Sequence, residues 1–118
     1  WYLLNDKKLS GRAKAIFQAA EKNQTLLIMS SIVLAELYYA NAKNKWFPDF
    51  GELYADLTSQ PYMRFVPVDH VHIPEFAEDA TVPEMHDRII AGVARRLGAL
   101  LLTSDPLITA AAVVTTVW

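Results

Sequence analysis

The stretch that decides the fold is PEMHDRIIAGVARRLGALLLTSDPLI, residues 83–108. Its first part has apolar residues at helical spacing, which predicts a helix over residues 84–97 that ends at Gly98. An apolar run of strand length follows at residues 99–103, and Ser104-Asp105-Pro106 is typical of the start of another helix. A helix, a buried strand and a second helix are therefore expected in immediate succession.

The rest of the chain shows the same alternation. Helices are predicted over residues 9–22 and 30–43 and after Pro48, where apolar residues recur at helical spacing. Short strands are predicted at residues 25–29, 64–68 and 113–118, and residues 69–78 fit either a short helix or an irregular turn. This order predicts a single three-layer α/β/α domain over residues 1–118, with a mainly parallel sheet.

Composition narrows the class of protein. The 118 residues are 53% hydrophobic and 20% charged, which fits one globular domain with a real core. The absence of Cys excludes disulfides and thiolate zinc sites and is consistent with a reducing, cytoplasmic location. The net charge of −2 is not that of a dedicated nucleic-acid binder, and clusters of Lys and Arg are interpreted as solvated faces. Apolar runs are too short or too interrupted to span a membrane.

Three acidic residues are expected at one edge of the sheet. Ligands of parallel α/β sheets gather outside the carboxyl ends of the strands. Glu36, in SSIVLAELYYA (residues 30–40), lies about two turns into the helix that follows one strand. Asp105 directly follows another strand, and Asp87 lies in the first turn of the helix over residues 84–97. All three carboxylates can therefore face one site.

Each acid also has a purely structural interpretation. Asp105 is a good helix N-cap, and Asp87 is favoured by the helix dipole. Glu36 is predicted to lie among apolar residues, where an ionised carboxylate needs a partner, and Arg88 is one candidate. Taken together, however, three converging carboxylates would repel one another unless a cation held them. Mg²⁺ or Mn²⁺ would do so, and such a site suits hydrolysis of phosphodiester bonds.

At this point the sequence resembles a known family. SSIVLAELYYA, residues 83–108 and the closing VVTTVW are similar to a PIN domain of the VapC type, the ribonuclease toxin of a bacterial or archaeal toxin–antitoxin pair. The resemblance implies an acidic quartet that binds Mg²⁺ or Mn²⁺ and cuts RNA, with Glu36, Asp87 and Asp105 as its second, third and fourth members. Thr103 matches a hydroxyl position that supports the site, although a threonine at a strand end has a simple structural explanation too.

The resemblance also implies partners. Toxins of this type form homodimers and are blocked by an antitoxin whose C-terminal segment lies across a groove. Trp46 and Phe47, which fall outside the regular helices, are candidates for lining such a groove, although most aromatic residues nearby are expected in the core.

The first acid of the quartet is missing from this sequence. In the family it is an Asp at the end of an N-terminal strand in the centre of the sheet, and the present sequence starts after that position. Asp6 lies in a polar turn and is no substitute. We therefore expect roughly ten further residues upstream of Trp1, a strand plus a turn containing the Asp. Without them the chain should be inactive or severely impaired.

Alternative functions remain open from sequence. One is a catalytically silent PIN-like binding module. Another is a receiver-like or phosphatase-like domain, although a receiver needs a Lys after a late strand and none follows Lys45. The pair His70 and His72 hints at a metallohydrolase, but two partly exposed imidazoles are the simpler interpretation. His86 is interpreted as a surface histidine.

Overall fold

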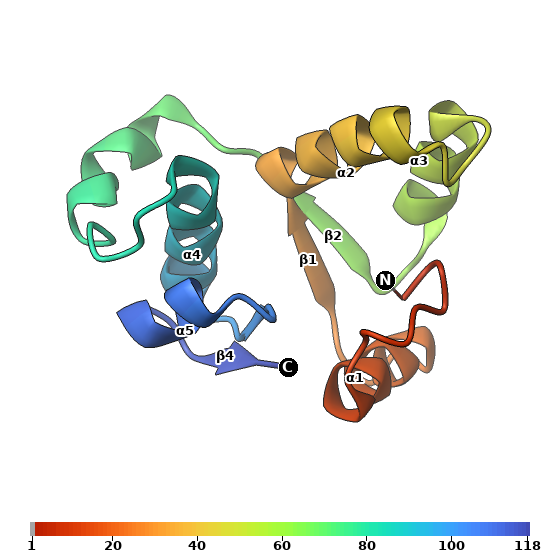
Figure 1. Cartoon of the computed structure of the whole chain (residues 1–118), viewed down its shortest axis with the longest axis horizontal. Helices are drawn as coiled ribbons and strands as arrows, with labels where there is room; N and C mark the ends of the chain where they lie inside the picture. Colours follow the sequence, from red (N-terminus) through yellow and green to blue (C-terminus); the bar gives the residue numbers. More distant parts are fainter. Residues whose placement is uncertain (1) are drawn as a thin grey trace. The chain divides into compact units, whose positions relative to one another are not determined.

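The computed structural model describes residues 2–118 and divides the chain after Pro67 into two compact units (Figure 1). We call residues 1–67 the first unit and residues 68–118 the second unit. Each contains helices and a pair of parallel strands. Each unit has a hydrophobic core of its own, and the division after Pro67 separates the residues of the two cores.

The first unit contains five elements, which are α1 (Gly11–Glu21), β1 (Leu27–Ser30), α2 (Ser31–Asn44), α3 (Phe50–Ser59) and β2 (Met63–Val66). Strands β1 and β2 are parallel, and their register runs from Leu27 opposite Met63 to Ser30 opposite Val66. The carboxylate of Asp49 starts α3 by accepting hydrogen bonds from the next backbone N–H groups. The core of this unit is built on Leu53, Leu57 and Met63.

The second unit also has five elements, which are η1 (His70–Ala77, a 3₁₀ helix), α4 (Met85–Leu97), β3 (Leu101–Leu102), α5 (Pro106–Ala111) and β4 (Thr116–Val117). Strands β3 and β4 are parallel. Helix α4 ends at Gly98, whose φ of 60° is the left-handed conformation that glycine adopts most readily. The core contains Val82, Ala91 and Ile108.

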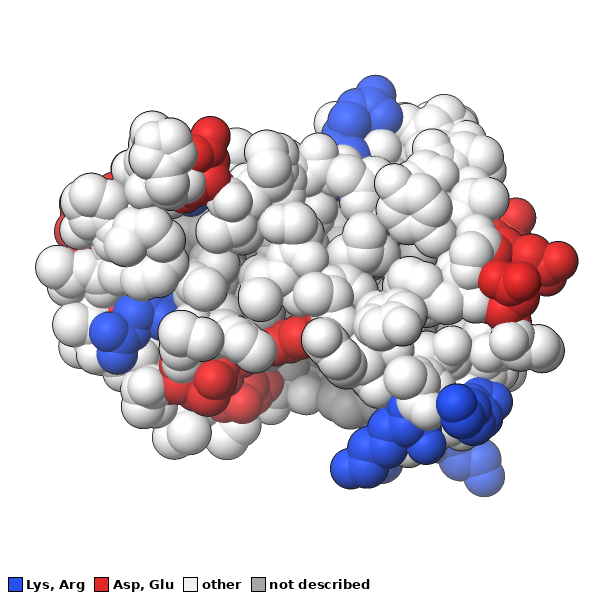
Figure 2. Space-filling model, turned by 90° about the horizontal axis from the view of Figure 1, so that it is seen from above, with Lys and Arg blue, Asp and Glu red and all other residues white. Residues whose placement is uncertain are grey.

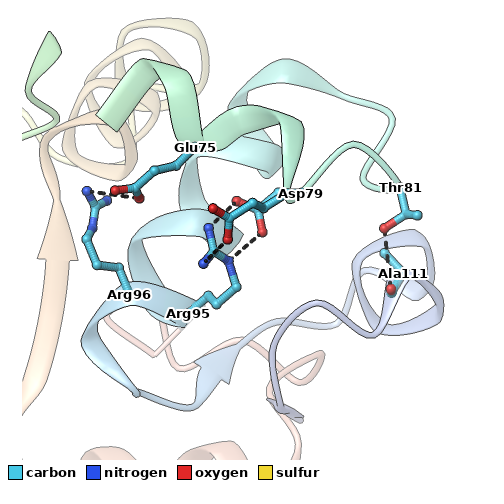
Figure 3. A network of polar contacts seen from close by, with 7 residues as sticks. Glu75, Asp79, Thr81, Arg95, Arg96 and Ala111 are labelled. Carbon is cyan, nitrogen blue, oxygen red and sulfur yellow. Dashed lines mark hydrogen bonds and ion pairs between the residues drawn. The ribbon is translucent and has the colours of Figure 1, made fainter. Parts of the chain in front are cut away.

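A network of charged side chains fastens the end of η1 to α4 (Figure 3). Asp79 is completely buried, and its two carboxylate oxygens accept hydrogen bonds from Nε and Nη2 of Arg95 at 2.8 and 3.1 Å. Arg95 also contacts Glu78 at 2.9 Å. Gly92 makes room for the buried carboxylate, because a Cβ at this position would lie 2.7 Å from Oδ2 of Asp79.

The structure confirms the predicted α/β class and most of the predicted elements. The strands are shorter than expected, and the segment 69–78, which by sequence fits either a short helix or an irregular turn, contains the 3₁₀ helix η1. Strand pairing is parallel, as predicted, and the described strands pair as two separate ladders. The three-layer arrangement and the single domain stay predictions.

The N-terminal segment is held against α1 by Tyr2. Its ring stacks on Phe17 with 4.2 Å between centroids, and its hydroxyl donates a hydrogen bond to the carboxylate of Glu21. This hydrogen bond, assisted by burial and by the negative charge, raises the pKa of Tyr2 to about 12. The protonated hydroxyl is therefore favoured by the folded state.

This raised pKa predicts a loss of stability in alkali. The contribution of Tyr2 is fully present below the pKa of about 10 that the residue has in the unfolded chain, and is lost as the pH rises toward about 12. Melting temperatures of the wild type and Tyr2→Phe should therefore converge between pH 9 and 12. The prediction is wrong if the difference between the two proteins does not change over that range.

Candidate functional site

Asp105 is presented at the carboxyl end of β3 as the N-cap of α5. Its Oδ1 accepts hydrogen bonds from the backbone N–H groups of Leu107 and Ile108 at 2.7 and 3.4 Å. Oδ2 has no hydrogen-bond partner among residues 2–118, so one oxygen caps the helix and the other can bind a ligand. The structural interpretation of this residue is confirmed, and it leaves room for the functional one.

Thr103 fixes the backbone on which Asp105 sits. Its Oγ1 accepts a hydrogen bond from the Asp105 N–H at 3.0 Å, and its own N–H donates to the carbonyl of Val117 at 3.1 Å. The hydroxyl thus connects the strand ladder to the helix start. This geometry fits the supporting role predicted for Thr103, because rotation of the Asp105 backbone would break the contact.

Asp87 lies in the first turn of α4 and is partly buried. Its N–H donates a 2.9 Å hydrogen bond to Glu84, the N-cap of the helix, and this bond lowers the pKa of Glu84. The loop before α4 is held by Arg88, whose guanidinium donates to the carbonyls of Val82 and Ala80 at 2.9 and 3.4 Å. The first turn of α4, which carries Asp87, is therefore held by the N-cap Glu84 and by the hydrogen bonds of Arg88 to the preceding loop.

Glu36 corrects one prediction. It was expected to lie among buried apolar residues, but in the structure its side chain is exposed. The reason is that the face of α2 that carries Glu36 is not a buried one, since Val33 is only partly buried and Tyr39 is 72% exposed. No desolvation penalty therefore calls for a partner at Glu36, and a role in binding must be supported by other observations.

A model of one protein family matches almost the whole chain. It is the model of the PIN domain, and it covers residues 1–113. The chain belongs to the PIN-domain family. PIN domains are generally nucleases that act on nucleic acid and bind divalent metal ions. No curated protein matches the chain.

Glu36, Asp87 and Asp105 of this PIN domain carry carboxylate oxygens, the kind of ligand that Mg²⁺ and Mn²⁺ prefer. Glu36 belongs to the first unit, whereas Asp87 and Asp105 belong to the second. Over residues 2–118 the structure places no three His, Cys, Asp or Glu side chains together as a metal site. Carboxylate oxygens suit the divalent metal ions that the family binds. That all three acids bind one such ion is part of the function proposed below.

The histidines of the second unit have separate structural roles. His70 is exposed and pairs with the carboxylate of Asp69 at 2.6 Å. His72 is partly buried, and its Nδ1 accepts a hydrogen bond from the Asp69 N–H at 3.3 Å. Both imidazoles therefore contact Asp69, the N-cap of η1: His70 contacts its carboxylate and His72 its backbone N–H. His86 is partly buried beside Asp87 rather than fully exposed.

The turn at Asp6 is as expected from the sequence. Its Oδ1 accepts a hydrogen bond from the Lys8 N–H at 2.9 Å, and its carbonyl accepts from Leu9. These are the contacts of a polar turn that leads into α1, so the side chain has a local structural role.

The loop after α2 is held by Asn41, a buried residue whose role is not evident from the sequence. Its side chain accepts a 2.8 Å hydrogen bond from the Phe47 N–H and donates one of 3.1 Å to the Phe47 carbonyl. Phe47 packs against the core of the first unit, whereas Trp46 remains 43% exposed. Of the two predicted groove residues, Trp46 therefore has its ring accessible and Phe47 contributes mainly to packing.

None of the helices over residues 2–118 is long and apolar enough to cross a membrane.

Proposed function

We propose that this PIN domain is a Mg²⁺- or Mn²⁺-dependent endoribonuclease and the toxin of a toxin–antitoxin pair. The observation that carries the proposal is the geometry at Asp105 in a chain that matches the PIN family over residues 1–113. One oxygen of this carboxylate accepts the hydrogen bonds that start α5, and the other makes no hydrogen bond among residues 2–118. A rigid acid with an open oxygen is what a hard cation requires of a ligand.

The residues have distinct proposed roles. Glu36, Asp87 and Asp105 hold the metal, and Thr103 keeps Asp105 in position. The metal, when bound, activates water and stabilises charge on the phosphate that is cut.

RNA cleavage by the full-length protein tests the proposal. Cleavage should require Mg²⁺ or Mn²⁺ and stop on addition of EDTA. Glu36→Gln and Asp87→Asn should each reduce the rate at least about 100-fold, because even partners that merely orient metal ligands contribute about 10- to 100-fold. Circular dichroism of each variant checks that folding is intact.

The matched control is Glu52→Gln, which removes an exposed carboxylate in the first turn of α3 that is not one of the proposed ligands. Its cleavage rate should equal that of the wild type. Metal-independent cleavage, or full activity of folded Glu36→Gln and Asp87→Asn, would contradict the proposal. Folded protein that binds RNA without cutting it would identify a silent PIN-like module instead. The receiver-like alternative has no support in the family match.

The proposed biological setting is a homodimer in the cytoplasm, inhibited by its cognate antitoxin. Co-expression with the product of the neighbouring gene should yield a complex in which RNA cleavage is suppressed.

A further inference from the structure

Helix α2 carries an exposed stripe of three chemically different side chains. Glu36, Tyr39 and Lys43 follow one another at i, i+3 and i+7, so they lie on one face of the helix. All three are exposed, and Tyr39, at 72%, is the most exposed of the large hydrophobic residues among residues 2–118. Along the helix axis, Tyr39 is about 4.5 Å and Lys43 about 10 Å from Glu36.

The ring of Tyr39 is exposed but supported. Tyr38, on the neighbouring face, packs edge-on against Phe50 of α3 with 5.1 Å between ring centroids. Tyr38 in turn contacts Tyr39 edge-on at 5.4 Å. A T-shaped contact of this kind restrains a ring through its edge and leaves most of its surface in water. Tyr39 is therefore in contact with one neighbouring ring while most of its own surface is accessible.

We propose that α2 is an RNA-stacking surface, on which Tyr39 stacks against an unpaired base and Lys43 contacts a neighbouring phosphate. The inference rests on the proposed ribonuclease function, in which Glu36 helps to hold the metal at the phosphate to be cut. It adds the form of RNA that is recognised. Bases inside a duplex are stacked on one another, whereas bases in loops and single strands can stack on an exposed aromatic ring.

The chemistry of the stripe favours RNA over a protein partner. Tyr39 lies between a carboxylate and an ammonium group, whereas the centre of a protein interface is depleted of charged residues. The first unit contains eight Lys or Arg residues and six Asp or Glu residues, while the second contains three and seven. Figure 2 shows that basic and acidic side chains both occur on the face it presents. Net positive charge and an aromatic platform thus occur in the same unit.

Binding of a mixed-sequence RNA oligonucleotide to the full-length protein in EDTA tests the inference without cleavage. Tyr39→Leu should weaken binding of the single strand about 5- to 150-fold, the loss of one base–aromatic stack. Tyr39→Phe should retain the affinity, since it keeps the ring. Lys43→Gln should reduce the slope of log affinity against log salt by about 0.7, the loss of one phosphate contact.

Tyr54→Leu is the matched control, because Tyr54 is a 46% exposed tyrosine on α3 of the same unit. It should bind RNA like the wild type, and none of the variants should change binding of the duplex form comparably. The inference is overturned if wild-type protein binds no RNA, if Tyr39→Leu retains affinity, or if Tyr54→Leu loses as much. It is also overturned if Tyr39→Leu changes only the oligomeric state, which would make the face a protein interface.

The two proposals can fail separately. If RNA is not cut but its binding depends on the Tyr39 ring, the nuclease proposal fails and the stacking surface stands. If cleavage depends on Glu36 while binding ignores Tyr39, the stacking surface alone fails.

Discussion

Arg95→Met is expected to lower the free energy of unfolding by about 3–5 kcal/mol, the cost of leaving a buried charge without its partner. Asp79 is completely buried, and among residues 2–118 its carboxylate is bonded by the Arg95 guanidinium alone. Removing Asp79 instead should cost less, because Arg95 is 28% exposed and keeps its contact with Glu78. The two ends of one ion pair should therefore give unequal losses.

Urea unfolding, followed by circular dichroism, measures these differences. Arg96→Met is the matched control, since Arg96 is similarly exposed and follows Arg95 on α4, but its contact with the partly exposed Glu75 is a looser 3.6 Å. It should cost about 1 kcal/mol or less. The double variant Asp79→Leu/Arg95→Met should be more stable than Arg95→Met, because it leaves no buried charge. Equal losses of unfolding free energy in Arg95→Met and Arg96→Met would show that the ion pair with Asp79 contributes no more to stability than an exposed one.

The elements of residues 83–108 could be predicted because their signals are local. Gly98 ends α4 in the left-handed conformation, and Asp105 with Pro106 starts α5, as the sequence indicates. Each signal acts over a few residues through backbone geometry or capping, so it needs no knowledge of the tertiary structure. The structural role of Asp105 was predictable for the same reason.

The ion pair between Asp79 and Arg95 could not be predicted from local patterns, because its partners are 16 positions apart. The sequence does contain one signal of a close approach to α4, which is Gly92 in the middle of a strong helical pattern. Such a glycine often indicates that another group approaches the helix closely, and here that group is the Asp79 carboxylate. Which group would approach depends on how η1 packs on α4, and the sequence does not specify this.

The exposure of Glu36 could not be predicted for a different reason. Tyrosines count as apolar in a periodicity argument, but Tyr38 and Tyr39 are 50% and 72% exposed. An aromatic residue with a polar hydroxyl can face either water or the core. The prediction that Glu36 lies in a buried apolar stripe of α2 was therefore wrong. The same exposure is what makes Tyr39 available for stacking.

Asp105→Asn should separate the two functions of this residue, with at least about a 100-fold loss of RNA cleavage in the full-length protein and almost no change in stability. Asn is as good an N-cap as Asp, so the hydrogen bonds that start α5 can persist. The charge that would hold the metal in the proposed function is lost. Asp105→Ala should lose activity and about 1 kcal/mol of stability as well, because the cap is removed.

Thr103→Val completes the series, since it keeps the shape of the side chain and removes the oxygen that accepts the Asp105 N–H. If Thr103 acts only by positioning Asp105, the loss of activity should be about 10- to 100-fold, smaller than for Asp105→Asn, and should be partly restored by raising the Mn²⁺ concentration. Thr103→Ser, which keeps the hydroxyl, should restore most activity. Unchanged cleavage by folded Asp105→Asn would show that this carboxylate is a helix cap and not a metal ligand. A loss of cleavage without a loss of stability would show that it takes part in the reaction.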